Sequence, residues 1–258
     1  MAVNLHHQVI GQGEPVVLLH GLFGMGSNLG ALARSLADDF TVYSVDLPNH
    51  GRSGWVDSMD LASMATAILG WSAREGIGSA HWLGHSLGGK IAMHIALNRP
   101  EQVRRLLVAD IAPVAYPPRH QPVFAALEAV AAARCDSRRA AAALMDEHLE
   151  EPGVADFLLM SLARQADGHY DWRLNLKALK ANYAALSAGL ESERSFDAPT
   201  LFVKGEDSAY IRAEHRDVIE GLFPAASLKV IPGAGHWLHA QQPRLFNGVV
   251  GRFLRAAD

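Results

Sequence analysis

Gly84-His85-Ser86-Leu87-Gly88-Gly89 places a serine between closely spaced glycines. The apolar run 80–83 before it has the length of a strand, and residues 90–97 after it have helical composition and apolar periodicity. This context is typical of the G-x-S-x-G turn, which lifts a nucleophile from a strand to the N-terminus of a helix. Strand and helix can approach closely there because glycines lack side chains. The stretch therefore predicts Ser86 as a nucleophile.

The composition is that of a globular enzyme. The 258 residues are 49% hydrophobic and 19% charged, which fits one large domain, or one core domain with an insertion. The 23 Lys and Arg residues and 27 Asp and Glu residues leave a formal charge of −4 without a basic block, so we expect no nucleic-acid partner. The apolar runs are too short to span a bilayer, and residues 1–13 do not resemble a signal peptide, so no membrane insertion is expected.

Cysteine and histidine usage limits the chemistry further. The single cysteine, Cys135, argues against a disulfide framework and favours a reducing cytoplasm. The 13 histidines are scattered, and neither an H-E-x-x-H nor a C-x-x-C spacing occurs. We therefore expect no metal site.

Strand-like runs alternate with helical ones, which predicts an α/β fold with a mostly parallel central sheet and helices on both faces. The first strand precedes this alternation and is expected as an antiparallel edge. The expected strands are 3–10, 16–20, 40–46, 80–83, 103–109, 200–204 and 227–231, and the expected core helices are 29–37, 61–75, 89–98, 213–222 and 243–255.

Residues 112–195 interrupt the alternation. They are rich in alanine and leucine and contain no convincing strand, and helical patterns occur at 123–134, 138–149, 154–164 and 176–188. Prolines mark both ends of the segment. We expect a helical cap, inserted after the fifth parallel strand into an α/β core domain made of residues 1–111 and 196–258.

A serine nucleophile needs a general base, which in this type of chain follows the last strand. The loop 232–237 follows the expected strand 227–231 and predicts His236 as the base. His239 is the rival, but it lacks the preceding glycines.

The developing oxyanion needs backbone N–H donors. Leu87, directly after the serine, is expected to supply one. The loop 20–24, which follows strand 16–20, is expected to supply the other through Leu22, with Phe23 as the alternative. Its glycines let the backbone approach a substrate oxygen.

The residue that orients the base has three candidates. In the common G-E-x-D pattern after the strand that follows the cap, Ser208 stands at the aspartate position and Asp207 comes one residue early. Asp110 lies at the end of the expected strand 103–109, which precedes the cap. The carboxyl ends of parallel strands border the ligand crevice. We favour Asp110, with Asp207 and then Glu206 as alternatives, and a turn cap is the other interpretation of Asp110.

Four residues are expected to contact the substrate. His85 occupies the variable position of the serine turn, and Phe23 and Trp237 flank the expected oxyanion donor and base. Phe157 belongs to an apolar stripe of a cap helix. Most of such a stripe forms core, and the remainder is a candidate for an acyl pocket.

Together these motifs resemble the α/β-hydrolase superfamily, and more narrowly its YbfF-like carboxylesterase branch, relatives of the mitochondrial α/β-hydrolase-domain proteins. The resemblance implies hydrolysis of carboxylic esters, usually with short acyl chains, without a cofactor. It also implies a triad acid after the strand preceding the cap, in agreement with Asp110. The sequence departs from the branch where acidic residues follow Gly205. The segments that carry the resemblance are 20–24, 28–29, 49–51, 84–90, 110–113 and 233–237.

The sequence thus predicts a serine carboxylesterase acting on a small-molecule ester. Ser86 attacks the ester, His236 takes its proton and Asp110 orients His236. The alternatives are another Ser-His-Asp hydrolase of the fold (a thioesterase, lactonase, perhydrolase or C–C hydrolase) or a non-catalytic small-molecule receptor.

Overall fold

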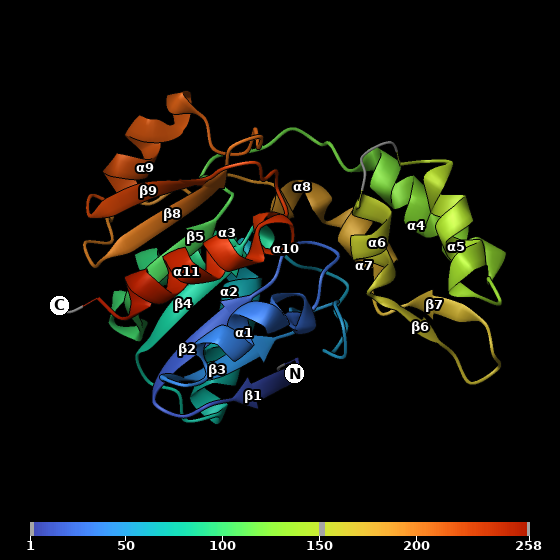
Figure 1. Ribbon diagram of the computed structural model, residues 1–258, viewed down its shortest axis with the longest axis horizontal. Helices are drawn as coiled ribbons and strands as arrows, with labels where there is room; N and C mark the ends of the chain where they lie inside the picture. Colours follow the sequence, from blue (N-terminus) through green and yellow to red (C-terminus); the bar gives the residue numbers. More distant parts are fainter. Residues whose placement is uncertain (1–2, 150–152, 257–258) are drawn as a thin grey trace.

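A computed structural model describes residues 3–149 and 153–256 (Figure 1). Residues 1–2, 150–152 and 257–258, which the expected core and cap ranges include, lie outside the described residues. A seven-stranded sheet has the order β1-β3-β2-β4-β5-β8-β9. Its strands are β1 (His7–Ile10), β2 (Glu14–Leu19), β3 (Phe40–Val45), β4 (Ala80–His85), β5 (Val103–Ala109), β8 (Thr200–Gly205) and β9 (Ala226–Ile231).

The pairing within this sheet is parallel except at one edge. β1 pairs antiparallel with β3, whereas β2, β3, β4, β5, β8 and β9 are mutually parallel. The prediction of an α/β fold with a mostly parallel sheet is confirmed, and so is the antiparallel edge.

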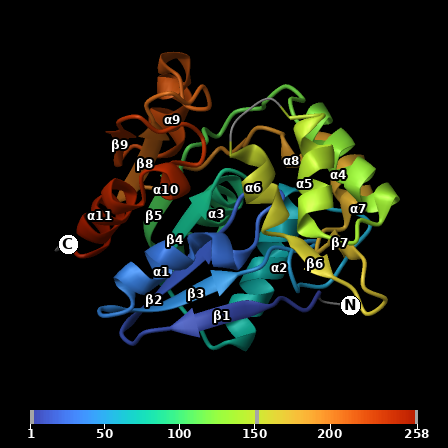
Figure 2. The same cartoon turned by 45° about the vertical axis from the view of Figure 1, so that its right-hand side comes forward.

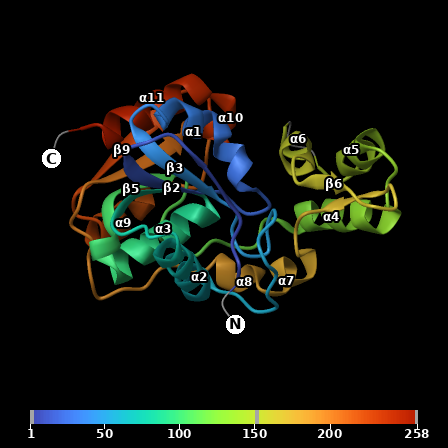
Figure 3. The ribbon, with the colours of Figure 1, turned by 90° about the horizontal axis from the view of Figure 1, so that it is seen from below.

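Helices cover both faces of the sheet because alternate side chains of a buried strand point to opposite sides. In β2, Val17 and Leu19 pack on the side of α2 (Leu61–Arg74) and α3 (Leu87–Asn98), and Val16 and Leu18 pack on the other. Figure 3 shows α1 and α11 on one side of the strands and α2 and α3 on the other. The remaining helices of the core are α1 (Gly30–Leu36), α9 (Arg216–Leu222), α10 (Leu238–Gln241), α11 (Pro243–Leu254) and the short η1 (Gly26–Leu29), η2 (Pro100–Gln102) and η3 (Ala213–His215).

The local sequence explains the longest of these helices. Asp60 precedes α2 and accepts a hydrogen bond from the Ser63 N–H at 2.7 Å, while the Asp60 N–H donates to the Ser63 hydroxyl at 2.9 Å. This reciprocal cap satisfies two N–H groups that a helix start leaves free. Apolar residues at helical spacing then form the buried face of α2, namely Leu61, Met64, Ala65, Ile68 and Trp71.

Between β5 and β8 the chain forms a largely helical insertion that lies to one side of the sheet (Figures 1 and 2). β5 is the fifth strand of the chain but the fourth parallel one, because β1 is antiparallel, so the expected count of parallel strands was one too high. The helices of the insertion are α4 (Gln121–Ala133), α5 (Arg138–Asp146), α6 (Val154–Leu159), α7 (Leu176–Ala181) and α8 (Tyr183–Leu186).

The expectation that this insertion contains no strand was wrong. The expected helix 154–164 ends at Leu159, and β6 (Leu162–Arg164) pairs antiparallel with β7 (Tyr170–Trp172). Gly168, with a φ of 95°, allows the turn between them. The Trp172 indole N–H donates to the Leu127 carbonyl at 2.8 Å and attaches the hairpin to α4.

No helix within residues 3–149 and 153–256 has the length and apolar character needed to cross a bilayer.

Candidate active site

Ser86 lies at the turn between β4 and α3 with a φ of 51° and a ψ of −116°. A positive φ is uncommon for a residue other than glycine, and it points the side chain away from both elements. A Cβ atom added to Gly84 would overlap the Gly88 carbonyl oxygen, and one added to Gly88 would overlap that of Leu19. The two glycines therefore allow the close approach of strand and helix that the turn requires.

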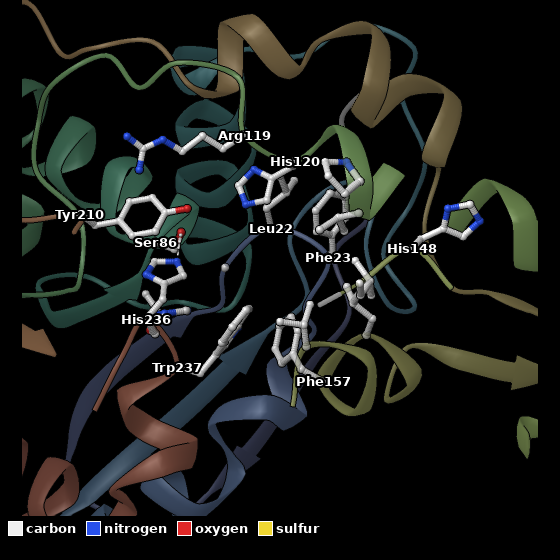
Figure 4. Close-up of a pocket in the computed structure, with 17 residues that line it drawn as sticks. Leu22, Phe23, Ser86, Arg119, His120, His148, Phe157, Tyr210, His236 and Trp237 are labelled. Carbon is white, nitrogen blue, oxygen red and sulfur yellow. Dashed lines mark hydrogen bonds between the residues drawn. The ribbon is translucent and has the colours of Figure 1, made fainter. Parts of the chain in front are cut away.

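Three side chains form a hydrogen-bond chain at the carboxyl ends of the parallel strands. The Ser86 Oγ lies 3.0 Å from His236 Nε2 (Figure 4), and His236 Nδ1 lies 2.7 Å from Asp110 Oδ2. Ser86 follows β4, Asp110 follows β5 and His236 follows β9. Such ends meet at one edge of a parallel sheet, which is why residues 150 positions apart can touch.

Asp110 is fully buried and accepts hydrogen bonds through both carboxylate oxygens. The Gly205 N–H donates to Oδ1 at 3.0 Å, and the Ser208 hydroxyl donates to Oδ2. A buried carboxylate needs such donors, because burial without partners would favour its neutral form. These donors also set the plane of the carboxylate relative to His236.

The alternative acids point elsewhere. Glu206 and Asp207 are exposed, and the Glu206 carboxylate accepts from the Gly233 N–H at 2.9 Å. The Asp207 N–H is bonded to the Ala234 carbonyl, at 2.9 Å. The structure brings Asp110, and neither of these carboxylates, against His236.

The rival base His239 is also separate from Ser86. It is buried, and its ring packs edge-on against His85 with centroids 4.6 Å apart. Burial lowers its pKa to about 4, so it is neutral near pH 7.

Leu22 and Leu87 line one space together with Ser86, and their backbone N–H groups are the expected oxyanion donors. Within the described residues neither group has a hydrogen-bond acceptor from the protein. The Phe23 N–H, the alternative donor, is already bonded to His50 Nε2 at 3.2 Å. Leu87 is also the first residue of α3, whose positive dipole end faces the site.

Two buried histidines hold the loop that carries Leu22. His20 Nε2 accepts from the Leu47 N–H at 2.9 Å, and His50 Nδ1 donates to the Pro48 carbonyl at 2.8 Å. Burial lowers the pKa of His20 to about 4 and that of His50 to about 3. Both rings are therefore neutral near pH 7, which leaves the Nε2 acceptors available.

A cavity of about 530 Å³ opens beside Ser86 and His236. All four residues expected to contact substrate line it, namely Phe23, His85, Phe157 and Trp237. The Phe157 ring from α6 and the Trp237 ring lie 5.6 Å apart and join the insertion to the core (Figure 4). His85 is 2% exposed and its Nε2 lies 2.8 Å from the His236 carbonyl, so it also supports the loop of the base.

The sequence interpretation missed several residues of this site. Ser208 had a signal, because it occupies the position where the G-E-x-D pattern places an aspartate. Tyr210 had none, and its ring stacks on that of His236 with centroids 3.9 Å apart. The Tyr116 hydroxyl accepts from the Ala112 N–H at 2.9 Å and donates to the Tyr210 carbonyl. Arg119 and His120 line the cavity without belonging to any motif.

No cluster of three or more His, Cys, Asp and Glu side chains with the arrangement of a metal site occurs in the part of the chain that the structure describes.

The model of the alpha/beta hydrolase family matches residues 16–249. The chain belongs to this family. Esterase YbfF of Escherichia coli (strain K12) is 39% identical to this alpha/beta hydrolase over 242 residues, 93% of each chain.

Two further relatives agree. The sn-1-specific diacylglycerol lipase ABHD11 of Mus musculus is 36% identical over 247 residues, 93% of this chain and 80% of that protein. The solved structure of a marine microorganism esterase is 36% identical, with a TM-score of 0.94 over 97% of this chain and 99% of that chain. The predicted YbfF-like branch is confirmed, and so is the prediction that this alpha/beta hydrolase is a carboxylic ester hydrolase.

A buried lysine lies four residues beyond Ser86 in this alpha/beta hydrolase. The Lys90 ammonium donates to the carbonyls of Val114, at 2.9 Å, and Ser187, at 3.0 Å, and also to that of Ala188. Val114 leads into the insertion, and Ser187 and Ala188 lead out of it. Lys90 therefore ties both connecting segments to α3, and burial lowers its pKa from 10.5 to about 7.

This lowered pKa predicts how stability depends on pH. Between about pH 7 and 10.5 the unfolded chain keeps a proton that folded Lys90 has lost, so the free energy of unfolding rises with pH in that window. The wild-type value should gain up to about 1.4 kcal/mol per pH unit relative to Lys90→Met. Denaturant unfolding at several pH values measures the difference. Lys180→Met, at an exposed lysine paired with Glu128, is the control. A difference that stays constant from pH 7 to 10 would contradict the assignment.

Proposed function

We propose that this carboxylic ester hydrolase cleaves small, short-acyl esters through an acyl-enzyme on Ser86, with His236 as general base and Asp110 as the orienting acid. The observation that carries the proposal is the continuous hydrogen-bond chain from the Ser86 Oγ through His236 to the buried Asp110. A serine hydroxyl is a weak nucleophile until an adjacent base takes its proton, and this chain supplies the base in contact with the serine.

In the acylation step the Ser86 Oγ bonds to the ester carbonyl carbon while its proton passes to His236 Nε2. The carbonyl oxygen becomes an oxyanion between the N–H groups of Leu22 and Leu87, which carry no other protein acceptor among the described residues. The carbon–oxygen bond to the alcohol then breaks. His236 returns its proton to the departing alkoxide, so the alcohol leaves neutral.

Deacylation repeats these steps with water. His236 takes a proton from water as its oxygen bonds to the acyl carbon, and the same N–H groups hold the second oxyanion. The Ser86–acyl bond breaks, and the proton on His236 returns to the Ser86 oxygen. Asp110 stabilises the imidazolium in both halves and fixes the ring so that Nε2 faces Ser86.

The proposal also covers the substrate walls, the cap and the cellular compartment. Phe23, His85, Phe157 and Trp237 form walls against which the ester packs. Residues 112–195 form a cap that closes the site over a core of residues 1–111 and 196–258. A lone, buried cysteine suits the reducing cytoplasm, which we propose as the compartment.

The chain-length profile of p-nitrophenyl esters tests this function. We expect kcat/KM to be highest for acetate to butyrate and to fall towards laurate, because a confined acyl site rejects added methylenes by about tenfold or more each once it is full. The Ser86→Ala variant serves as the blank for spontaneous hydrolysis. A profile that rises towards laurate would contradict the short-acyl assignment, and activity equal to the blank for every ester would contradict the function.

A further inference from the structure

Ser86 stands between two cavities of different size. Besides the chamber of about 530 Å³, a second cavity of about 40 Å³ adjoins the serine. Ser86 and Leu22 line both spaces, so the two meet at the nucleophile. The walls of the small cavity include Leu87, Ile111, Pro117 and Leu186.

The base faces only one of these spaces. Among the described residues, His236 lines the large chamber but not the small cavity. Because His236 Nε2 must protonate the departing alkoxide, the alcohol oxygen has to lie on the His236 side of the tetrahedral carbon. The oxyanion points towards the N–H groups of Leu22 and Leu87. The one substituent left, the acyl chain, then points towards the small cavity.

We infer that the small cavity is the acyl site and that the large chamber receives the alcohol, so that this enzyme cleaves short-acyl esters of bulky alcohols. The inference rests on the proposed function and deepens it. It also reassigns Phe157, because the apolar stripe of α6 lines the large chamber and therefore meets the alcohol, not the acyl chain.

The volumes set the expected limits. A water-sized group needs about 10 to 15 Å³ of such space, so a cavity of about 40 Å³ accepts roughly three carbons beyond the carbonyl, a butyryl chain. Lys90 and Ser187 line this cavity, and the hydrogen bonds from Lys90 to the carbonyls of Val114 and Ser187 hold that part of its wall in place. The chamber of about 530 Å³ has room for an alcohol many times larger.

Two substrate series on the wild-type enzyme test the assignment. The first varies the acyl chain from acetate to octanoate with p-nitrophenol as the alcohol, and the second varies the alcohol from methanol to hexanol and naphthol with acetate as the acyl group. We expect kcat/KM to fall about tenfold or more from butyrate to hexanoate, and to hold or rise along the alcohol series. A steep fall along the alcohol series with a flat acyl series would overturn the assignment while leaving the serine esterase intact. No Ser86-dependent hydrolysis in either series would overturn both.

Substitutions in the walls of the two cavities test which of them limits the length of the acyl chain. Leu186→Ala should raise the ratio of hexanoate to butyrate kcat/KM by about tenfold, since Leu186 is buried in the wall of the small cavity. Ile111→Val removes a single methyl group from the same wall. It replaces Leu186→Ala in this measurement if Leu186→Ala does not fold. The matched control is Phe157→Ala in the large chamber, which should shift the alcohol series and leave the acyl ratio unchanged. The ratio is taken within one variant, so partial unfolding does not affect it. If Phe157→Ala changes the acyl ratio and the small-cavity variants do not, the two sites are reversed.

Discussion

Ser86→Ala is expected to lower kcat for p-nitrophenyl acetate by about 10⁵- to 10⁶-fold, the scale seen when a serine-hydrolase nucleophile is removed. The methyl group of alanine cannot form the acyl bond. The Leu22 and Leu87 N–H groups can then stabilise only the oxyanion that forms when water attacks the ester directly. His236→Ala should cost a similar factor, because the Ser86 hydroxyl then loses the acceptor that lies 3.0 Å away.

The double variant distinguishes a joint mechanism from independent effects. Residues that act as one unit are strongly non-additive, so Ser86→Ala/His236→Ala should be no slower than either single variant. Unfolding curves of all three variants exclude a loss of folded protein. Retention of a tenth of wild-type kcat in Ser86→Ala would show that another group is the nucleophile.

Asp110→Asn is expected to lower kcat by about 10⁴-fold, whereas Asp207→Asn should change it by less than about twofold. Asparagine at position 110 would place a neutral amide against His236 Nδ1, lose the charge that stabilises the imidazolium and favour the wrong tautomer. The amide nitrogen cannot accept a hydrogen bond, so either the Gly205 N–H or the Ser208 hydroxyl would also lose the acceptor that the carboxylate provides. Asp207 is exposed and lies outside this network, which makes it the matched control.

The pH profile of kcat/KM is measured for each variant together with kcat. If Asp207→Asn proves the more damaging substitution, the loop 205–208 must rearrange in solution so that Asp207 reaches His236, and the role of Asp110 would be structural. An equal fall in kcat in both variants would indicate that each substitution disrupts the structure of the loop, and not that one of them removes the orienting acid.

Much of this site could be predicted because it depends on local spacing. The serine turn needs glycines at fixed positions around Ser86, and the base follows the last strand, so both were visible in the sequence. The expected strands of the central sheet agree with the observed ones to within a few residues for the same reason, since short apolar stretches within them are visible in the local sequence.

The features that were missed depend on the three-dimensional path of the chain. Ser208 meets Asp110 only because β5 and β8 are neighbours in the sheet. Tyr210 stacks on His236 from a loop with no periodicity. The three-residue strands β6 and β7 are too short for an alternating pattern to be recognised, and the apolar residues of β6 therefore read as a continuation of α6.

The most direct test of the site is covalent labelling of the nucleophile. Diethyl p-nitrophenyl phosphate reacts with an activated serine to form a stable phosphoryl ester, and p-nitrophenol leaves. Intact-mass spectrometry and peptide mapping after this reaction should find one diethylphosphoryl group per chain, on the peptide that contains Ser86, and none in Ser86→Ala or His236→Ala. Labelling that persists in Ser86→Ala, or that maps to another residue of the wild-type enzyme, would contradict the assignment of Ser86 as a nucleophile activated by His236.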